Sequence, residues 1–156
     1  MRNQLKINPV PCTACLSCVM ACSQYHKNAT GSEYSALQLI VDPFNGDHHF
    51  NHCRQCVEAL CAAACPVHSI SWAESFRAWV LNPETCIHCG RCVDACPFDA
   101  LPWPDHDDVP IKCDLCEGDP ECVKACHFGV LTFEPDISPS YSGIPKKDLD
   151  PGLGKE

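Results

Sequence analysis

Residues 86–97 read Cys86-Ile-His-Cys89-Gly-Arg-Cys92-Val-Asp-Ala-Cys96-Pro97. Four cysteines fall in this stretch at gaps of two, two and three residues, a spacing typical of ligands to an iron–sulfur cluster. The two short gaps allow three thiolates to reach one cluster. The gap of three is one helical turn, so it predicts that Cys96 binds a neighbouring cluster. Pro97 lacks an N–H group and ends that turn.

Cysteines at this density can also bind zinc or form disulfides. Tetrahedral zinc sites usually combine two CxxC motifs across a longer spacer, so this stretch does not readily close on one zinc ion. A disulfide framework is typical of secreted domains, and the sequence has no sign of an export signal. We therefore expect iron–sulfur clusters, with zinc and disulfides as the alternatives.

The same pattern occurs three more times along the chain. The other twelve cysteines fall into groups of four, which are Cys12, Cys15, Cys18 and Cys22; Cys53, Cys56, Cys61 and Cys65; and Cys113, Cys116, Cys122 and Cys126. Each group ends in the same gap of three residues, so the repeat is internal. The 16 cysteines predict four [4Fe–4S] clusters with no ligand left over.

The residues after each group indicate how the groups pair. The second and third groups both end in Cys-Pro, whereas Ser23 and His127 follow the first and fourth. We infer an inner pair from 53–65 and 86–96, and an outer pair from 12–22 and 113–126. Exchange of the fourth cysteine within each pair predicts these ligand sets: Cys86, Cys89, Cys92 with Cys65; Cys53, Cys56, Cys61 with Cys96; Cys12, Cys15, Cys18 with Cys126; and Cys113, Cys116, Cys122 with Cys22.

Composition and charge argue against some functions. The 156 residues have a formal net charge of −9, and thiolate ligands would make the charge more negative. Nucleic acid is not expected as a partner because phosphate binding needs a basic face. A basic patch on a partner protein suits this surface better. The 46% hydrophobic content includes the cysteines, so the apolar core is modest and we expect metal binding to supply much of the folding free energy.

The sequence also indicates where the protein works. Its N-terminus has neither an apolar leader region nor a twin arginine, and no run of residues is long and apolar enough to span a membrane. We expect a cytoplasmic protein without a membrane span. The alternative is that the protein is exported together with a partner that has its own signal.

Short strand-like segments lie between the cysteine groups and predict a small α+β fold. The expected strands are Leu37–Val41, His48–Phe50, Ser69–Trp72, Ala78–Leu81, Leu101–Trp103, Val109–Lys112 and Val130–Phe133. Single helical turns are expected at Val93–Ala95 and Val123–Ala125. We predict a duplicated bacterial-ferredoxin-like fold with two pseudo-symmetric halves of two clusters each.

Residues 1–133 form the predicted four-cluster domain, and 134–156 form a tail. The tail contains prolines, glycines and mixed charges but no cysteine, so we expect it to be extended. We expect it to lie on a partner subunit, with packing back onto its own domain as the alternative.

A few residues outside the cysteines are candidates for a role at a cluster. We expect His26 to cap a turn or face solvent, with modulation of a cluster as the alternative. His88 and Arg91 either tune a cluster or are simply exposed. No nucleotide-binding fingerprint, catalytic triad or zinc-protease motif is present, and no cysteine is left for a catalytic iron. The sequence therefore predicts an electron carrier without a catalytic site.

The order of the four groups resembles the four-cluster electron-transfer subunits of molybdenum and tungsten oxidoreductases. This resemblance covers residues 12–133. Relatives include the iron–sulfur subunits of dimethyl sulfoxide reductase, formate dehydrogenases and formate hydrogenlyase. The run Cys22-Ser23-Gln24-Tyr25-His26 is similar to the small ferredoxin-like subunits of tungsten aldehyde oxidoreductases and benzoyl-CoA reductases.

The resemblance implies a function and partners. It implies a polyferredoxin subunit that carries single electrons between a larger tungsten- or molybdenum-pterin aldehyde oxidoreductase and a second redox protein, such as a flavin or NAD subunit or a ferredoxin. A subunit of a formate dehydrogenase, hydrogenase or dimethyl sulfoxide reductase-type complex is the alternative. A free-standing polyferredoxin and a zinc-bound structural protein also stay open, as does head-to-tail self-association.

Overall fold

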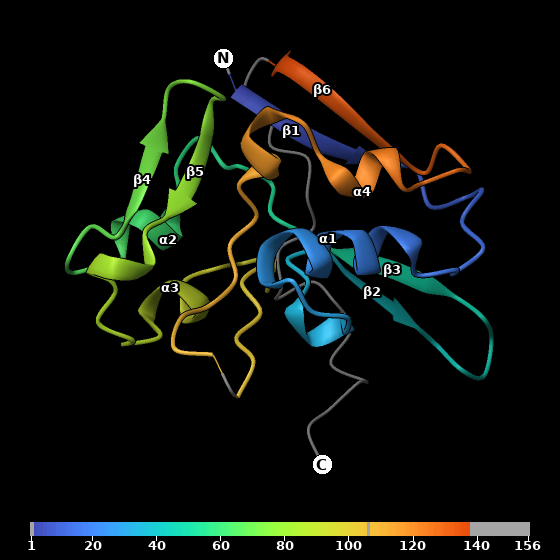
Figure 1. Cartoon of the computed structure of the whole chain (residues 1–156), viewed down its shortest axis with the longest axis horizontal. Helices are drawn as coiled ribbons and strands as arrows, with labels where there is room; N and C mark the ends of the chain where they lie inside the picture. The colour runs from blue at the N-terminus through green and yellow to red at the C-terminus, as the bar shows by residue number, and fades with distance from the viewer. Residues whose placement is uncertain (1, 106, 138–156) are drawn as a thin grey trace.

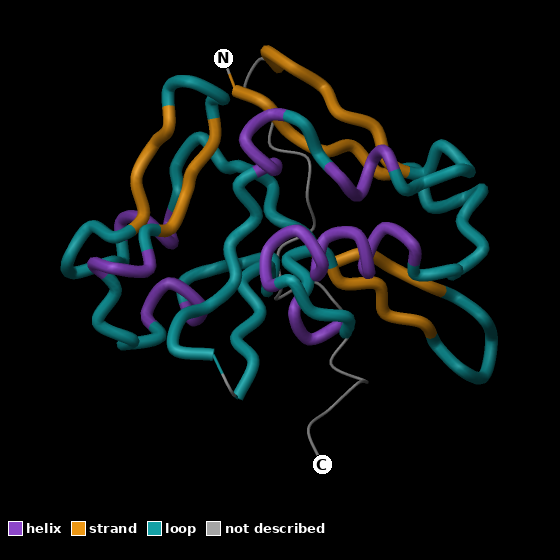
Figure 2. Tube along the Cα trace, viewed as in Figure 1, coloured by secondary structure: helices purple, strands orange, loops and turns teal. Residues whose placement is uncertain are grey.

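The computed structural model describes residues 2–105 and 107–137, which form short helices, long loops and three two-stranded antiparallel sheets (Figure 1). This is the small α+β fold expected from the sequence. The sheets pair β1 (Arg2–Ile7) with β6 (Leu131–Ile137), β2 (Gln38–Val41) with β3 (His48–Asn51), and β4 (Ile70–Ala73) with β5 (Ala78–Leu81). Loops connect and surround these elements (Figure 2).

Two of the sheets are the local hairpins that the sequence predicted. The β2–β3 hairpin turns at Gly46, whose φ of 76° lies in the left-handed region that favours glycine. In the β4–β5 hairpin, Trp72 lies opposite Trp79, and their ring centroids are 5.6 Å apart in an edge-to-face arrangement. The indole N–H of Trp79 donates to the Cys56 carbonyl at 3.0 Å, so this hairpin is attached to a cysteine loop.

The third sheet joins the two ends of the described chain. Strand β1 pairs with β6, with Leu5 opposite Phe133, and no strand was predicted for Arg2–Ile7. Strand β6 continues beyond position 133 into the first residues of the predicted tail. The rest of that tail, 138–156, lies outside the described residues.

One predicted pair of strands is absent from the described structure. Leu101–Trp103 and Val109–Lys112 are irregular, and one backbone bond joins them, from Ile111 N to Pro102 O at 2.8 Å. Pro102, Pro104 and Pro110 cannot donate a backbone hydrogen bond, so this segment cannot form a regular ladder. The prediction of two strands here was wrong for that reason.

The helices follow the spacing of the cysteines. Three are single turns that end just before the fourth cysteine of a group, as predicted for the last two: α2 (Leu60–Ala63), α3 (Arg91–Asp94) and α4 (Glu121–Lys124). The first, α1 (Ser17–Lys27), continues past Cys22, where no proline interrupts it. No helix within the described residues is long and apolar enough to cross a membrane.

Buried side chains gather in two clusters that share no residue. One includes Leu5, Val19 and Leu131 and underlies α1, which packs against α4. The other includes Ile70 and Phe98 and underlies α2, which packs against α3. Figure 1 shows these two pairs of helices side by side, with β4–β5 next to the second pair and β1–β6 above the first. The chain therefore packs as two small cores around its cysteine loops.

Gln55 links the two cores. Its side chain is completely buried, its Nε2 donates to the Cys113 carbonyl at 2.7 Å, and its Oε1 accepts from the Trp79 amide at 2.7 Å. One side chain therefore satisfies backbone groups from the last cysteine group and from the β4–β5 hairpin.

We predict that Gln55→Ala destabilises the protein. The variant leaves the Cys113 carbonyl and the Trp79 amide without a partner, which costs roughly 2–4 kcal/mol of folding free energy. The measurement is the Tm of cluster-loaded protein in an anaerobic melt, compared at equal iron content. Gln24→Ala removes an exposed side-chain hydrogen bond and should change stability by less than about 0.5 kcal/mol. Equal Tm values for the two variants would contradict the role assigned to Gln55.

Candidate iron–sulfur centres

The four cysteine groups share one backbone conformation. In each group the residue before the second cysteine has a positive φ, namely 53° at Ala14, 47° at Gln55, 57° at His88 and 61° at Leu115. None of these residues is glycine, and few other residues adopt this conformation without support from their surroundings. The repeat seen in the sequence is therefore also a repeat in the backbone.

In three of the groups, the last cysteine makes the same backbone hydrogen bond. The amides of Cys65, Cys96 and Cys126 each donate to the carbonyl three residues earlier at 3.2 Å. The Sγ atoms of Cys65 and Cys96 accept from the amides four residues later, at 3.2 and 3.4 Å. Cys22 differs because it lies inside α1. Amides that donate to sulfur favour the thiolate form, which is the form that binds metal.

One predicted ligand set surrounds a cavity in the α2–α3 half of the chain. Cys65, Cys86, Cys89 and Cys92 line about 330 Å³ of space, part of it open to solvent. Cys89 is exposed, and Ile87 on the same cavity has 57% of its surface exposed. The structure brings these four sulfur-bearing residues together at the surface.

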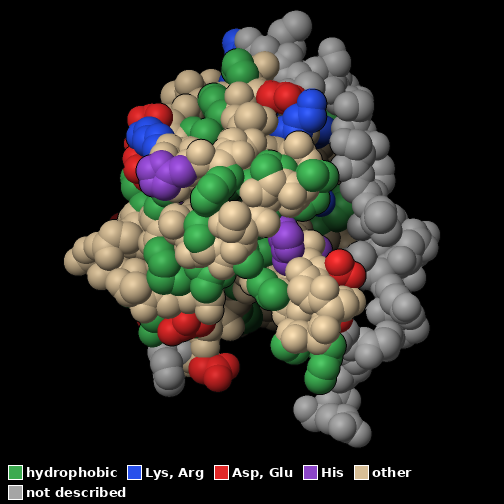
Figure 3. Space-filling view, turned by 90° about the vertical axis from the view of Figure 1, so that its right-hand side faces the viewer, with side chains coloured by type: hydrophobic (Ala, Val, Ile, Leu, Met, Phe, Trp, Pro, Cys, Tyr) green, Lys and Arg blue, Asp and Glu red, His purple; other side chains and the backbone are tan. Residues whose placement is uncertain are grey.

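A second predicted set surrounds a matching cavity in the α1–α4 half. Cys12, Cys15, Cys18 and Cys126 line about 290 Å³ together with Leu16 and Phe128. Cys15 is exposed, and Phe128 is half exposed. Figure 3 faces the end of the molecule that holds the β2–β3 turn and shows hydrophobic side chains across its middle, with charged groups towards the rim.

The third set lies in the interior. Burial raises the pKa of Cys61 to about 11, and the negative charges of Cys53 and Cys96 add to the shift. Burial, Cys53 and Cys96 also raise the pKa of Cys56. The charges of Cys53 and Cys96 act on both Cys56 and Cys61, so the structure brings these four cysteines together.

The fourth set is the most deeply buried. Burial and the neighbouring thiolates of Cys22 and Cys116 raise the pKa of Cys122. Burial also raises the pKa of Cys113, followed by the charges of Cys53, Cys22 and Cys122. Cys113 and Cys122 therefore ionise readily only if a cation compensates their charge, and iron in a cluster would supply that compensation. Four soft sulfur donors in each set suit [4Fe–4S] clusters, and they would also suit zinc.

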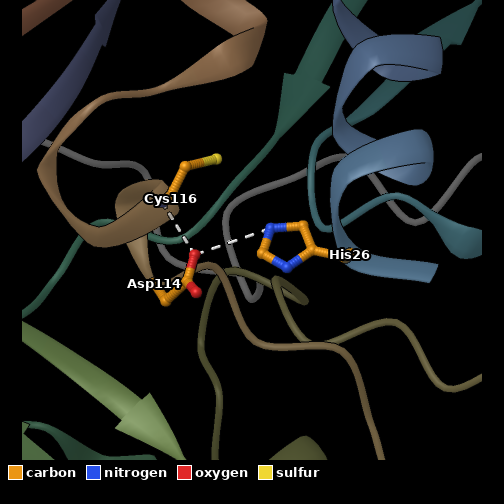
Figure 4. Close-up of side chains that lie close together, drawn as sticks. All are labelled: His26, Asp114 and Cys116. Carbon is orange, nitrogen blue, oxygen red and sulfur yellow. Dashed lines mark hydrogen bonds and ion pairs between the residues drawn. The ribbon is translucent and has the colours of Figure 1, made fainter. Parts of the chain in front are cut away.

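His26 lies beside this fourth set, which differs from the expected turn cap or exposed position. Only 13% of its side chain is exposed, and its Nε2 is 3.6 Å from Asp114 Oδ1 (Figure 4). Burial alone would lower the pKa of His26, but hydrogen bonds to the Cys116 and Cys22 thiols and the charge of Asp114 raise it to about 10. His26, Asp114 and Cys116 are close enough to hold a metal ion together. Because Cys116 belongs to the fourth set, we assign His26 to the surroundings of that set.

Other side chains at the sites were not found from the sequence. Lys112 donates from Nζ to Cys53 Sγ at 3.1 Å, although it precedes a cysteine of a different group. Arg2 and Arg54 also interact electrostatically with Cys56. His88 and Arg91, which the sequence suggested as tuning residues, are both exposed. No sequence pattern identifies a contact that the tertiary fold creates between distant segments.

Comparison with known proteins identifies iron–sulfur relatives of this chain. A family model described as a 4Fe-4S dicluster domain matches residues 51–100. The polyferredoxin-like subunit of an aliphatic sulfonate oxidoreductase from Pyrococcus furiosus is 37% identical over 78% of this chain and 69% of its own length. An uncharacterised ferredoxin from Methanocaldococcus jannaschii is 37% identical over 74% of this chain and 62% of its own length.

A solved structure extends the comparison to the fold. The BamBC active-site complex of benzoyl-CoA reductase contains a chain that aligns with a TM-score of 0.51 and 23% identity, covering 97% of this chain and 86% of that one. This likeness concerns the fold alone.

The exchange of fourth cysteines can be tested by combining substitutions. If Cys96 binds with Cys53, Cys56 and Cys61, Cys96→Ser should remove about one quarter of the iron. Adding Cys53→Ser should then remove no more, because both changes affect one cluster. Adding Cys86→Ser should remove a second quarter.

Iron analysis of anaerobically purified variants gives the measurement. Cys65→Ser is the matched control. Combining it with Cys86→Ser should remove no more iron than either change alone, whereas combining it with Cys53→Ser should remove a second quarter. If Cys96→Ser and Cys86→Ser together removed no more iron than either alone, both residues would bind one cluster, and the predicted exchange of fourth cysteines would be refuted.

Proposed function

This chain belongs to the family of polyferredoxin-like iron–sulfur proteins, and on that premise we propose that it carries single electrons between a catalytic subunit and a second redox partner. We propose four [4Fe–4S] clusters, bound by the four cysteine sets described above. Each bound cluster supplies a site that takes up and releases one electron. The chain itself fixes the order of these sites and controls their access to water.

The observation that carries this proposal is the burial of the cysteines. Each of the two cavity-forming sets has one exposed member, Cys15 or Cys89. In the third and fourth sets, by contrast, no cysteine is exposed. An electron carrier needs exposed sites where partners dock and protected sites between them, and this distribution matches that need.

The connections between the four cysteine sets support one continuous route for electrons. Cys92 and Cys96 flank the end of α3, and Cys18 and Cys22 lie one turn apart in α1, so each helix connects an exposed set to a buried one. The two buried sets meet where the Cys53 charge affects Cys113 and where Gln55 donates to the Cys113 carbonyl. The proposed order is therefore Cys89 set, Cys53 set, Cys113 set and Cys15 set.

The partner proposal combines sequence and relatives. We propose a tungsten- or molybdenum-pterin aldehyde oxidoreductase as the catalytic subunit, in the cytoplasm, with a flavin or NAD subunit or a ferredoxin at the other end. The relative from Pyrococcus furiosus is a subunit of an aliphatic sulfonate oxidoreductase, and a 26% identical relative from Aromatoleum evansii is the beta subunit of an NADH-dependent phenylglyoxylate dehydrogenase. Both names describe one subunit of a larger oxidoreductase, which supports this arrangement.

We infer that the α1–α4 and α2–α3 halves are duplicated two-cluster units. The repeated left-handed residue in all four groups and the equivalent packing of the two helix pairs support this inference.

We predict about sixteen iron and sixteen sulfide per chain in anaerobically purified protein. Four complete cysteine sets give this expectation, and elemental analysis with sulfide determination measures it. Treatment with an iron chelator should remove the clusters and unfold the chain, because its apolar cores are small. Folded protein with stoichiometric zinc and little iron would overturn the proposed function.

Charge placed at either exposed end should disturb one partner at a time. Ile87→Glu alters the cavity of the Cys89 set, and Phe128→Glu alters the cavity of the Cys15 set. We expect each variant to keep its iron and to lose at least about tenfold in affinity for one partner, which equals about 1.4 kcal/mol. The measurement is quantitative recovery of partners with tagged chain from its native host under anaerobic conditions.

Phe44→Glu is the matched control for these two variants. Phe44 is 96% exposed in the β2–β3 turn and lines neither cavity, so its substitution should leave recovery of both partners unchanged. Equal loss in all three variants would mean that the cavities are not the docking sites.

A further inference from the structure

The set formed by Cys53, Cys56, Cys61 and Cys96 has a buried lysine in direct contact. Lys112 is only 7% exposed, and its Nζ lies 3.1 Å from Cys53 Sγ. The side chain therefore places a buried, positively charged donor directly against a cysteine sulfur.

Two arginines add positive charge to the same set. Arg54 is half-buried, stacks 5.6 Å from the Phe98 ring centroid, and hydrogen-bonds through Nη1 to His52 Nε2 at 2.9 Å. Arg2 is 8% exposed and reaches the set from strand β1. Positive charge on Arg54 interacts with Cys56 and Cys53, and positive charge on Arg2 interacts with Cys56. We call Arg2, Arg54 and Lys112 the cationic triad.

The triad has donors without acceptors. Arg2 Nε, Arg2 Nη1 and Arg54 Nε are buried, and none has a hydrogen-bond partner among the residues that the structure describes. Burying charged donors without partners is unfavourable. A negatively charged group next to the triad would compensate both the charge and the missing hydrogen bonds, and a cluster bound by four thiolates is such a group.

The other three cysteine sets have less positive charge beside them. Within the described residues, Arg2 and Lys112 are the only buried lysine or arginine side chains. The two sets that line cavities, those of Cys89 and Cys15, open to solvent, which weakens their interactions with nearby charges. The Cys113 set has His26 beside it, but the carboxylate of Asp114 accompanies that histidine. The largest uncompensated positive charge therefore lies beside the Cys53 set.

We infer that the cationic triad makes the site of Cys53, Cys56, Cys61 and Cys96 the one with the highest reduction potential of the four. Reduction adds one electron and no proton, and the electron comes from the redox partner. Local positive charge and hydrogen bonds to sulfur stabilise the more negative, reduced state. The inference rests on the proposed function, and it places the first electron in the interior of the chain and not at either exposed end.

Stepwise reduction of the holoprotein followed by EPR tests this inference. Lys112→Met removes the charge, so the first reduction step should become at least tenfold less favourable, which is a shift of about 59 mV to lower potential. The other steps should shift less. Lys112→Arg keeps the charge and should keep the first step near its wild-type potential. Lys6→Met removes an exposed lysine and should leave every step unchanged.

Two outcomes of this titration would overturn the inference. One is an unchanged first step in Lys112→Met, and the other is a shift confined to a later step. If Lys112→Met does not hold its clusters, Arg54→Gln replaces it with the same expected shift. A wild-type protein without iron–sulfur clusters would instead refute the proposed function, so the two failures are distinct.

A second measurement uses the unmodified sequence. Protein labelled with ¹⁵N-lysine is reduced by one electron and studied by pulsed EPR. Because Lys112 contacts Cys53 Sγ, the first reduced cluster should show ¹⁵N hyperfine coupling. The coupling should be absent in Lys112→Arg. No ¹⁵N coupling in the wild-type, one-electron-reduced protein would overturn the inference whatever the variants do.

Discussion

The cost of burying thiolates controls this structure. Burial and nearby cysteine charges raise the pKa values of Cys61, Cys113 and Cys122, so the thiolate forms that bind metal are unfavourable there without a compensating cation. The backbone adds to this cost, because a non-glycine residue adopts a left-handed conformation in every cysteine group. Two small apolar cores alone would support such loops poorly. We therefore expect metal binding and folding to be coupled in this chain.

The parts of the fold that local sequence controls were predictable. Cysteine spacing identified all four groups, and alternating residues identified the β2–β3 and β4–β5 hairpins. The β1–β6 sheet was missed because its strands come from opposite ends of the chain and carry no local turn signal. The predicted strands around Asp105–Asp108 were wrong because three prolines outweigh the apolar pattern.

The surroundings of the candidate sites were less predictable than the ligands. Gln55, Lys112 and Arg2 each act on a segment far from their own in sequence, so no spacing rule identifies them. His26 was noticed but assigned to the wrong environment, since the sequence does not show that Asp114 and Cys116 lie against α1. The spacing of the ligands lies within one short stretch of sequence, whereas the charged residues around a site come from distant segments that the tertiary fold brings together.

The sheet between the chain ends has a consequence for biosynthesis. A ribosome synthesises β1 and the Cys12 group well before β6 and Cys126, with which they pair or share a cavity. The half built from residues 53–96 can assemble while the chain is still growing. The half that contains α1 must wait, with unprotected thiols, for its partner segment. The proposed ligand sets therefore give cofactor delivery to this protein a built-in order.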